Sequence, residues 1–323
     1  MSNQHWSRRL FVLIAALALA AGCAGSKTQP DATMDSLVTT EWLSQHLDDP
    51  NLVVLDCTVR IEPDEEGNIQ ALSGRADYES GHIPSAGFAD LMVDLSDNDS
   101  PHSFAVGTPE QFCAAMGALG VGDDSTVVLY DATGSVWAAR VWWMLRWAGF
   151  DRAALLDGGL KAWTDEGRPL STEPANRSPQ PMTPAPRPKL IADRDEVFAA
   201  LGNDAVSIID ALPGASFRGE MAMYDRPGHI PGASNIPSFA LVDESGHYRP
   251  YDELAAIFDG DRNARTIIYC GGGISASSDA FIMTRLGFTD VAVYTASLQE
   301  WAADPANPMV VSQPAENLRG IED

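Results

Sequence analysis

Ser80-Gly-His-Ile-Pro-Ser-Ala86 and Pro227-Gly-His-Ile-Pro-Gly-Ala233 are two versions of one motif, and this repeat decides how the chain folds. A string such as Gly-His-Ile-Pro that occurs twice in similar surroundings indicates that a whole unit has been duplicated. The length supports the same conclusion, because 323 residues exceed what one hydrophobic core usually holds. The sequence therefore predicts two similar domains.

Further pairs of segments extend the repeat in the same order and at a nearly constant spacing. Val127-Val-Leu-Tyr-Asp131 corresponds to Thr266-Ile-Ile-Tyr-Cys270. Farther along, the segment from Leu155 to Trp163 corresponds to the segment from Val293 to Trp301. The two copies therefore run in parallel to their ends, and they differ by small loop insertions.

Each copy alternates short runs of β-branched residues with helical stretches. In the first copy we expect strands at 53–56, 126–130 and 153–156 and helices at 109–119 and 136–147. In the second copy we expect strands at 206–210, 266–269 and 291–294 and helices at 251–258 and 275–286. This alternation is typical of an α/β fold, here two domains that are each a mostly parallel sheet flanked by helices.

An extended linker should join the two domains. Residues 171–189 are rich in proline, which favours an extended and semi-rigid segment. We therefore expect a first domain at 36–170, a second at 190–312 and a short tail at 313–323. Two such domains would face each other across a cleft.

The first 22 residues have the pattern of an export signal. Two arginines precede an apolar run at 10–21 that is too short to span a bilayer. The run ends in Leu19-Ala-Ala-Gly-Cys23, which resembles the lipobox of bacterial lipoproteins. The resemblance implies a lipidated Cys23, a tether at 23–35, and a membrane anchor that faces the periplasm, most simply from the outer membrane. Ordinary cleavage after Ala20 is the alternative, and it would leave a plain thiol.

Charge and cysteine content exclude several classes of protein. The formal net charge of -24 disfavours nucleic acid as a partner, because an acidic surface repels phosphate backbones. An anionic substrate would need a local positive feature to overcome this field. The four cysteines show no CxxC spacing, so we expect no disulfide framework, no metal and no cofactor. Cys57 and Cys113 lie in apolar segments and should be buried thiols.

The cysteine loop, residues 270–276, has the features of a nucleophile site. Cys270 ends a strand, and it is followed by Gly271, Gly272, Gly273, Ile274, Ser275 and Ala276. Ligands of open parallel sheets bind beyond the carboxyl ends of the strands. Three glycines let successive N–H groups turn towards one atom, and the following helix adds the positive end of its dipole. Such a cradle should favour the thiolate, the nucleophilic form of cysteine, and hold a substrate anion.

The string Tyr-Cys-Gly-Gly-Gly-Ile-Ser-Ala at 269–276 resembles the active loop of rhodanese-like sulfurtransferases, closest to the 3-mercaptopyruvate type. The Gly-His-Ile-Pro-Gly-Ala motif matches the same family, and Asp131 with Arg140-Val-Trp-Trp143 resembles its non-catalytic half. The resemblance covers residues 36–312. It implies that Cys270 takes a sulfane sulfur from a small anionic donor, thiosulfate or 3-mercaptopyruvate, and passes it as a persulfide to a thiol or cyanide acceptor.

The chain departs from the family at the residues that bind the donor. Members that bind mercaptopyruvate hold its carboxylate with an arginine where this chain has Ser216. Their loop serine, whose hydroxyl helps to protonate the leaving group, is replaced here by Gly272. Arg226 and Arg218 are the remaining cations that could bind substrate. Arg226 is favoured because it stands just before the Gly-His-Ile-Pro motif, whereas Arg218 could instead pair with Glu220.

Several polar residues of the repeat are expected to be structural. A carboxylate cannot form a persulfide, so Asp131, which stands where the second copy has Cys270, marks the first domain as a scaffold. His82 and His229 occur in both copies, so we expect each imidazole to bond backbone and hold its turn.

Two other functions fit parts of the pattern. A cysteine phosphatase also places its cysteine before an amide-rich loop, but it needs an arginine to close that loop, and Ala276 stands there. A non-enzymatic lipoprotein that binds a small anion, or relays persulfide to a partner, would keep the fold and the anchor without turnover.

Overall fold

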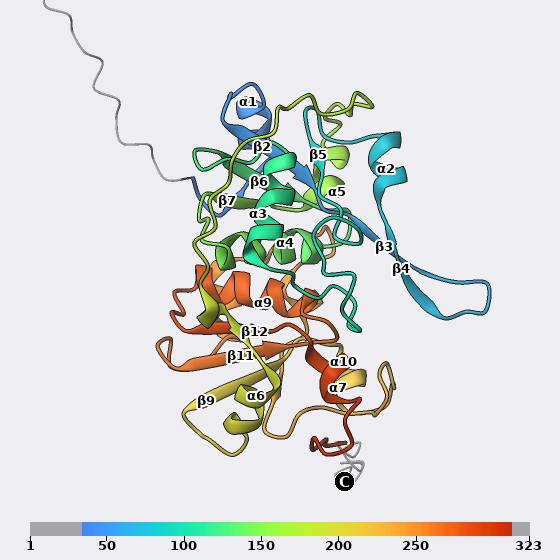
Figure 1. Cartoon of the computed structure of the whole chain (residues 1–323), viewed down its shortest axis with the longest axis vertical. Helices are drawn as coiled ribbons and strands as arrows, with labels where there is room; N and C mark the ends of the chain where they lie inside the picture. Colours follow the sequence, from blue (N-terminus) through green and yellow to red (C-terminus); the bar gives the residue numbers. More distant parts are fainter. Residues whose placement is uncertain (1–33, 312–323) are drawn as a thin grey trace, which may run out of the picture. The chain divides into compact units, whose positions relative to one another are not determined.

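The computed structural model describes residues 34–311, which belong to one compact unit that contains both predicted domains (Figure 1). The expected signal peptide, Cys23, most of the tether and the tail at 313–323 lie outside the described residues. Between residues 34 and 311, no helix is long and apolar enough to cross a membrane.

The first domain is built round a five-stranded sheet. From one edge to the other, its strands are β1 (Leu37–Val38), β7 (Ala153–Leu156), β6 (Thr126–Tyr130), β2 (Leu52–Asp56) and β5 (Gly87–Phe88). All neighbouring strands pair in parallel. Strand β2, which pairs with the middle strand β6, is buried along its whole length, and this is why it reads as a continuous apolar run in the sequence.

The second domain repeats this sheet strand by strand. Its order is β8 (Ile191–Ala192), β12 (Val291–Tyr294), β11 (Arg265–Tyr269), β9 (Val206–Asp210) and β10 (Ser234–Asn235). These strands also pair in parallel throughout. The predicted duplication and the predicted fold class are confirmed.

Helices flank both sheets. In the first domain they are α1 (Thr40–His46), α2 (Arg75–Ser80), α3 (Pro109–Ala118), α4 (Val136–Trp147) and α5 (Gly159–Asp165). In the second they are α6 (Arg194–Ala200), α7 (Gly214–Phe217), α8 (Tyr251–Ile257), α9 (Ile274–Arg285) and α10 (Ser297–Trp301), with 3₁₀ turns η1 (Pro188–Leu190) and η2 (Ser238–Leu241). An antiparallel hairpin of β3 (Val59–Pro63) and β4 (Ile69–Ser73), absent from our predictions, projects from the first domain (Figure 1).

The two domains meet through α4 and α9, the helices that follow Asp131 and Cys270 (Figure 1). The ring of Trp142 packs edge-on against Phe281, with 4.8 Å between the ring centroids. The two helices are almost wholly buried, so the domains share one hydrophobic core. This contact places the start of α4 beside the cysteine loop.

The proline-rich segment runs along the first domain. Residues 172–187 form no helix or strand, and their amides bond to the domain instead. Gln180 N–H donates to the carbonyl of Gly117 at 2.9 Å, and Ala185 N–H donates to that of Ala148 at 2.8 Å. The linker is therefore held by backbone hydrogen bonds.

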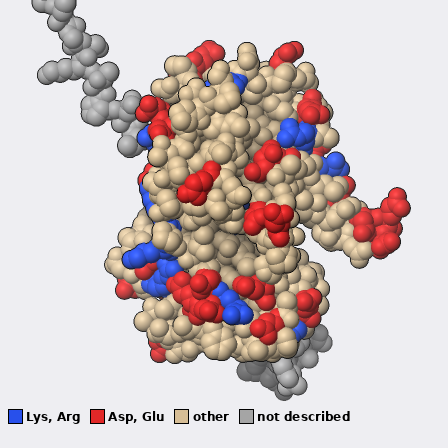
Figure 2. Space-filling view, viewed as in Figure 1, with Lys and Arg blue, Asp and Glu red and all other residues tan. Residues whose placement is uncertain are grey.

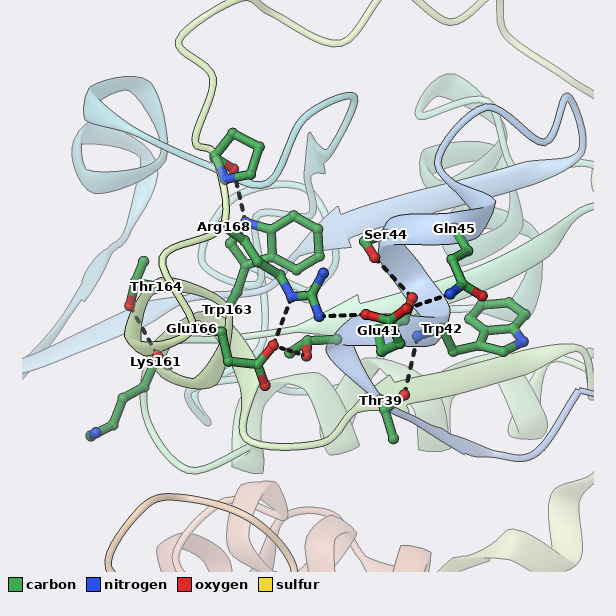
Figure 3. A network of polar contacts seen from close by, with 12 residues as sticks. Thr39, Glu41, Trp42, Ser44, Gln45, Lys161, Trp163, Thr164, Glu166 and Arg168 are labelled. Atoms are coloured by element: carbon green, nitrogen blue, oxygen red, sulfur yellow. Dashed lines mark hydrogen bonds and ion pairs between the residues drawn. The ribbon is translucent and has the colours of Figure 1, made fainter.

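The closing tryptophan of each copy fixes the chain after the last helix. Trp163 donates from its indole N–H to the carbonyl of Pro169 at 2.8 Å, and the Arg168 guanidinium lies over its ring in a wider polar network (Figure 3). In the second copy, Trp301 donates in the same way to the carbonyl of Pro308 at 2.9 Å. Both indoles are fully buried, so the repeated tryptophan has a structural role.

The acidic charge is spread over the surface. Figure 2 shows acidic side chains across the visible face, with lysines and arginines among them. Several of these cations are held in ion pairs, as where Arg265 bonds to Glu196 at 2.7 Å and to Asp290 at 2.8 Å. Surface cations that are held in such ion pairs are not available to bind an anionic substrate.

Candidate active site

Cys270 lies at the carboxyl end of β11, the middle strand of the second sheet. The residue is only 2% exposed. Its Sγ accepts a hydrogen bond from the N–H of Gly273 at 3.1 Å. Its own N–H donates to Oγ of Ser297 at 3.1 Å, and that hydroxyl donates to the carbonyl of Tyr294 at 2.6 Å. The sulfur thus accepts from one amide, and Ser297 fixes the backbone of Cys270.

The glycines let the loop close on the sulfur. Gly273 has φ of 81°, a left-handed conformation that costs a side-chain-bearing residue energy, and α9 begins at the next residue. Ile274, Ser275 and Ala276 form the first turn of this helix, whose N–H groups and dipole favour a negative charge nearby. Of the predicted cradle, the described structure contains one amide bonded to the sulfur, that of Gly273, followed directly by the start of α9.

Three hydrogen-bond donors occupy the places where side chains of the three glycines would stand. A Cβ atom on Gly271 would overlap the Tyr224 hydroxyl, and one on Gly272 would overlap the Gln299 amide nitrogen. A Cβ atom on Gly273 would lie 2.8 Å from Nη1 of Arg140.

All three glycines are thus required by the close approach of neighbours, and Gly273 is also required by its backbone conformation. A phenol, a carboxamide and a guanidinium surround the cysteine loop, and all three groups can donate to an anion.

Arg140 is the cation of this site, and it comes from the first domain. Its side chain is fully buried in α4. Nη2 donates to the carbonyl of Phe104 at 2.9 Å, Nη1 lies 3.4 Å from the carbonyl of Gly273, and Nε has no partner. Arg140 forms no salt bridge with any carboxylate of residues 34–311.

Burial lowers the pKa of Arg140 to about 10, and the neighbouring Cys270 opposes this shift. At neutral pH the guanidinium is therefore charged. It supplies the local positive feature that an acidic protein needs at an anion site.

Gln299 joins the two domains over the loop. Its Oε1 accepts from the N–H of Ser103 at 2.7 Å, and its Nε2 donates to the carbonyl of Ser103 at 3.3 Å. The Gln299 N–H also donates to the carbonyl of Gly271 at 3.1 Å. This glutamine therefore links the two domains next to Gly272.

The first domain keeps the same cradle and fills it with a carboxylate. One oxygen of Asp131 accepts from the N–H groups of Thr133 at 2.7 Å and Ser135 at 3.0 Å. The other oxygen accepts from those of Trp137 and Ala138, each at 2.9 Å. Burial raises the pKa of the Asp131 carboxyl, and these four N–H groups oppose the rise. In both copies the loop after the middle strand therefore directs backbone N–H groups at the residue that follows the strand, four at Asp131 and one at Cys270 Sγ.

The prediction that Arg226 binds a substrate carboxylate needs correction. Its guanidinium donates to four backbone carbonyls at 2.6 to 2.9 Å, those of Trp301, Ala302, Asp304 and Asn307. These carbonyls lie at and beyond the end of α10, where a cation is favourable. Four of its five N–H donors are thus used, whereas a bidentate carboxylate contact needs two. Arg226 is a structural residue in this arrangement.

Arg218 takes the alternative role that its neighbour suggested. Its guanidinium donates to both carboxylate oxygens of Glu220, at 2.7 and 2.8 Å, on the surface. The carboxylate of Glu220 raises the pKa of Arg218. Neither arginine chosen from the sequence therefore offers a free guanidinium to a donor.

Both repeated histidines are structural, as expected. Nδ1 of His82 lies 2.7 Å from the carbonyl of Tyr78, and Nε2 lies 3.0 Å from that of Glu173. Nδ1 of His229 lies 2.7 Å from the carbonyl of Phe217 and its ring stacks on the Phe217 ring.

The other two cysteines of the described segment are buried thiols. Burial raises the pKa of Cys57 well above its usual range and that of Cys113 to about 11. Within residues 34–311 no group of three His, Cys, Asp or Glu side chains gathers as a metal site would require.

Comparison with known proteins agrees with this geometry. The rhodanese-like domain family matches residues 39–166 and 193–304. The 3-mercaptopyruvate sulfurtransferase of Escherichia coli K12 is 34% identical over 275 residues, which cover 82% of this chain and 94% of the relative. The thiosulfate sulfurtransferase of Gallus gallus is 31% identical over 276 residues, 82% of this chain and 93% of the relative.

Solved structures show the same likeness. The crystal structure of SseA from Escherichia coli, described as a 3-mercaptopyruvate sulfotransferase, matches with a TM-score of 0.72 and 32% identity over 82% of this chain and 99% of that one. An anaerobic ergothioneine biosynthesis enzyme from Chlorobium limicola matches with a TM-score of 0.73 and 25% identity over 86% and 71%.

A tandem α/β protein with a cysteine in an amide cradle is the class that fold and site define. The chain belongs to the rhodanese-like domain family, as its cysteine loop predicted.

Proposed function

We propose that the protein is a sulfurtransferase of the 3-mercaptopyruvate or thiosulfate type, in which Cys270 carries the transferred sulfur. The observation that carries this proposal is the N–H of Gly273 at 3.1 Å from Sγ, in a loop surrounded by three further donors. Relatives that share about a third of their residues over most of both chains are sulfurtransferases with these two donors in their names. The expected enzyme class is thus supported by both site and relatives.

The chemistry would run in two half-reactions. In the first, the Cys270 thiolate attacks the outer sulfur of the donor, a sulfur–sulfur bond forms, and the donor's own bond to that sulfur breaks. Thiosulfate releases sulfite, and mercaptopyruvate releases pyruvate. In the second, a thiolate or cyanide attacks the outer sulfur and the Cys270 thiolate returns. The cradle would hold the negative charge on sulfur in both states.

Mercaptopyruvate should be the better donor. The described site holds one buried cation, Arg140, and no lysine or arginine follows Cys270 within the cysteine loop. A dianion such as thiosulfate would leave more charge uncompensated in this acidic protein than a monoanion does. We therefore expect the protein to prefer mercaptopyruvate, with Arg140 rather than Arg226 as the cation of the site.

Mass spectrometry of the intact protein tests the sulfur carrier. Incubation with either donor should add about 32 Da, the mass of one sulfur, to the wild-type protein, and peptide mapping should place it on Cys270. Cys270→Ser should gain no sulfur, whereas Cys113→Ser, which alters a buried thiol in the other domain, should behave as wild type. Persulfide that persists in Cys270→Ser would refute the assignment.

Turnover separates an enzyme from a carrier. With cyanide as acceptor, an enzyme releases many equivalents of thiocyanate per protein. A non-enzymatic protein that only binds an anion or relays persulfide would stop at or below one equivalent. Thiocyanate formation should also be faster with mercaptopyruvate than with thiosulfate, and the reverse order would contradict the donor preference.

We also propose that the mature protein begins at a lipidated Cys23 and faces the periplasm from the outer membrane. The support is the apolar run at 10–21 that ends in Ala-Gly-Cys. Ala24, the next residue, is not an acidic retention signal. Cys23→Ser should move the protein from the membrane fraction to the soluble fraction. A variant that remains wholly in the membrane would sink this part of the proposal.

A further inference from the structure

Tyr224 places a hydroxyl directly over the backbone that follows Cys270. It belongs to the segment between α7 and the Gly-His-Ile-Pro turn. Its Oη occupies the space that a Cβ atom on Gly271 would need, so the hydroxyl touches the cysteine loop. The ring packs against the hydrophobic core and is partly buried. The packed ring therefore holds the phenol hydroxyl against the cysteine loop.

The Tyr224 hydroxyl has no hydrogen-bond acceptor among the described residues. No hydrogen bond within residues 34–311 involves Tyr224 Oη. Burial raises the pKa of Tyr224, and the nearby Cys270 and Asp210 raise it further, so the phenol stays protonated through the neutral range. A protonated donor without an acceptor, beside a nucleophile, is suited to a group that arrives with the substrate.

Two serine hydroxyls next to the loop already donate to backbone carbonyls. Ser297 donates to the carbonyl of Tyr294 at 2.6 Å, and Ser277 donates to the carbonyl of Gly273 at 2.7 Å. Gly272 has no side chain at all, so the hydroxyl that the family carries at this position is missing. Among these groups, Tyr224 is the one whose proton is not committed to a backbone carbonyl.

The two donors differ in whether their leaving group needs a proton. Sulfite leaves thiosulfate as a stable anion. When the carbon–sulfur bond of mercaptopyruvate breaks, the electron pair passes to the enolate of pyruvate, which is strongly basic. A general acid close to the breaking bond therefore accelerates sulfur transfer from mercaptopyruvate and has little effect on transfer from thiosulfate.

We propose that Tyr224 is the proton donor to the pyruvate enolate, and that it adapts this site to donors whose sulfur is bound to carbon. The thiolate of Cys270 attacks the mercaptopyruvate sulfur, the S–S bond forms and the C–S bond breaks. The Tyr224 proton passes to the enolate, giving pyruvate, and the phenolate recovers a proton from the S–H of the new persulfide. The sum is thiolate plus mercaptopyruvate giving persulfide anion plus pyruvate. This role rests on the proposed function of Cys270.

Tyr224→Phe tests the role, because it removes only the oxygen. Persulfide formation should be followed in single turnovers with mercaptopyruvate, with thiosulfate and with inorganic polysulfide. The variant should react about 100-fold more slowly with mercaptopyruvate, the lower range for general acid catalysis, and within about threefold of wild type with the other two donors. Tyr251→Phe, which changes an exposed tyrosine at the start of α8, is the matched control and should leave all three rates unchanged.

A solvent isotope effect gives a second readout that packing alone would not move. The wild-type reaction with mercaptopyruvate should be slower in D₂O than in H₂O by a larger factor than the reaction with thiosulfate. An equal loss of rate with all donors in Tyr224→Phe, or no loss with any, would overturn the role while leaving Cys270 as sulfur carrier. A wild-type protein that forms no persulfide with any donor would overturn the proposed function and this role together.

Discussion

Replacing Arg140 by methionine should slow sulfur transfer to Cys270 far more than it destabilises the fold. Methionine keeps a flexible, unbranched side chain, but it is shorter than arginine and has no charge. The substitution removes the 2.9 Å hydrogen bond to the carbonyl of Phe104 and the 3.4 Å contact with Gly273. It also removes the positive charge that lies beside the sulfur without any carboxylate partner in residues 34–311.

The effect on stability is a difference of two opposing terms. Leaving the Phe104 carbonyl unpaired costs about 1 to 3 kcal/mol. A buried charge without a carboxylate partner is itself costly, so its removal returns several kcal/mol of desolvation. Because the terms oppose each other, we expect the free energy of unfolding to change by less than about 2 kcal/mol.

The effect on rate has no such compensation. A hydrogen bond or close contact between a charged donor and an anionic site is worth about 1.5 to 3 kcal/mol. At 1.36 kcal/mol per factor of ten, this corresponds to a fall of about 10- to 150-fold in the rate of persulfide formation. Alkylation of Cys270 by iodoacetamide at neutral pH should fall in the same direction, because the thiolate loses its neighbouring cation.

Single-turnover kinetics measure the effect on the rate of persulfide formation, and thermal unfolding measures the effect on stability. Arg140→Lys should recover part of the rate, since it restores a charge without the planar fork. Arg146→Met is the matched control: Arg146 lies on the same helix and bonds to Thr284 at 3.1 Å across the domain interface, but it does not reach the cysteine loop. Wild-type rates of persulfide formation and alkylation in Arg140→Met would show that the buried arginine serves only the fold.

Three further perturbations have clear expected outcomes. Arg226→Met should lower the free energy of unfolding by about 2 to 5 kcal/mol, because four backbone carbonyls lose their partner, while kcat/KM of the folded protein for mercaptopyruvate changes by less than about threefold. Gly272→Ser should displace Gln299 and speed alkylation of Cys270, and adding Gln299→Ala should cause little further change. Burial raises the pKa of Asp210 to about 6, so unfolding free energy should fall by about 3 kcal/mol as pH rises from about 4 to above 6. Denaturant titrations should show a shallower pH dependence in Asp210→Asn.

The interior of the fold was predictable because burial leaves a strong pattern. The bounds of β6, β7 and α4 agree with the prediction residue by residue, since parallel strands covered on both faces read as apolar runs. The edge strands β1, β5, β8 and β10 are two residues long and have no pattern of their own. They exist because a neighbouring strand offers its backbone, which is a tertiary effect.

The β3–β4 hairpin was missed for a different reason. Its strands carry charged and apolar residues together, and Ile61 and Ile69 are exposed, so no face shows the alternation of a half-buried strand. Acidic residues 64–66 at its tip resemble a solvated loop. The pairing of the two strands is defined by backbone bonds that side-chain patterns do not encode.

The candidate site was only partly predictable. Cys270 and its glycines could be predicted from the sequence, because the end of the strand, the glycines and the start of the helix are contiguous in the chain. Arg140 lies in the other domain, and in the sequence it stands out as part of a family motif, far from Cys270, rather than as a charge at the site. The error on Arg226 has the converse origin: closeness in sequence to the Gly-His-Ile-Pro motif does not fix the direction of a long side chain, which here turns to the end of α10.

One signal for the missing donors was nevertheless present in the chain. Three glycines in succession exceed what a single left-handed residue requires, because only Gly273 among them has positive φ. The other two, Gly271 and Gly272, are needed because Tyr224 and Gln299 approach the backbone. An excess of glycine over conformational need therefore indicates that other groups crowd the loop.

The two copies show how little separates a scaffold from a sulfur carrier. Asp131 satisfies its own cradle with a carboxylate that four N–H groups hold, so this site has no capacity left for a ligand. Cys270 offers a single atom to the same kind of cradle, and the remaining donors come from outside the loop. Because Arg140 reaches it from the first domain across the α4–α9 contact, the copy without a nucleophile still supplies the charge that the other copy lacks. Neither domain alone contains the complete site.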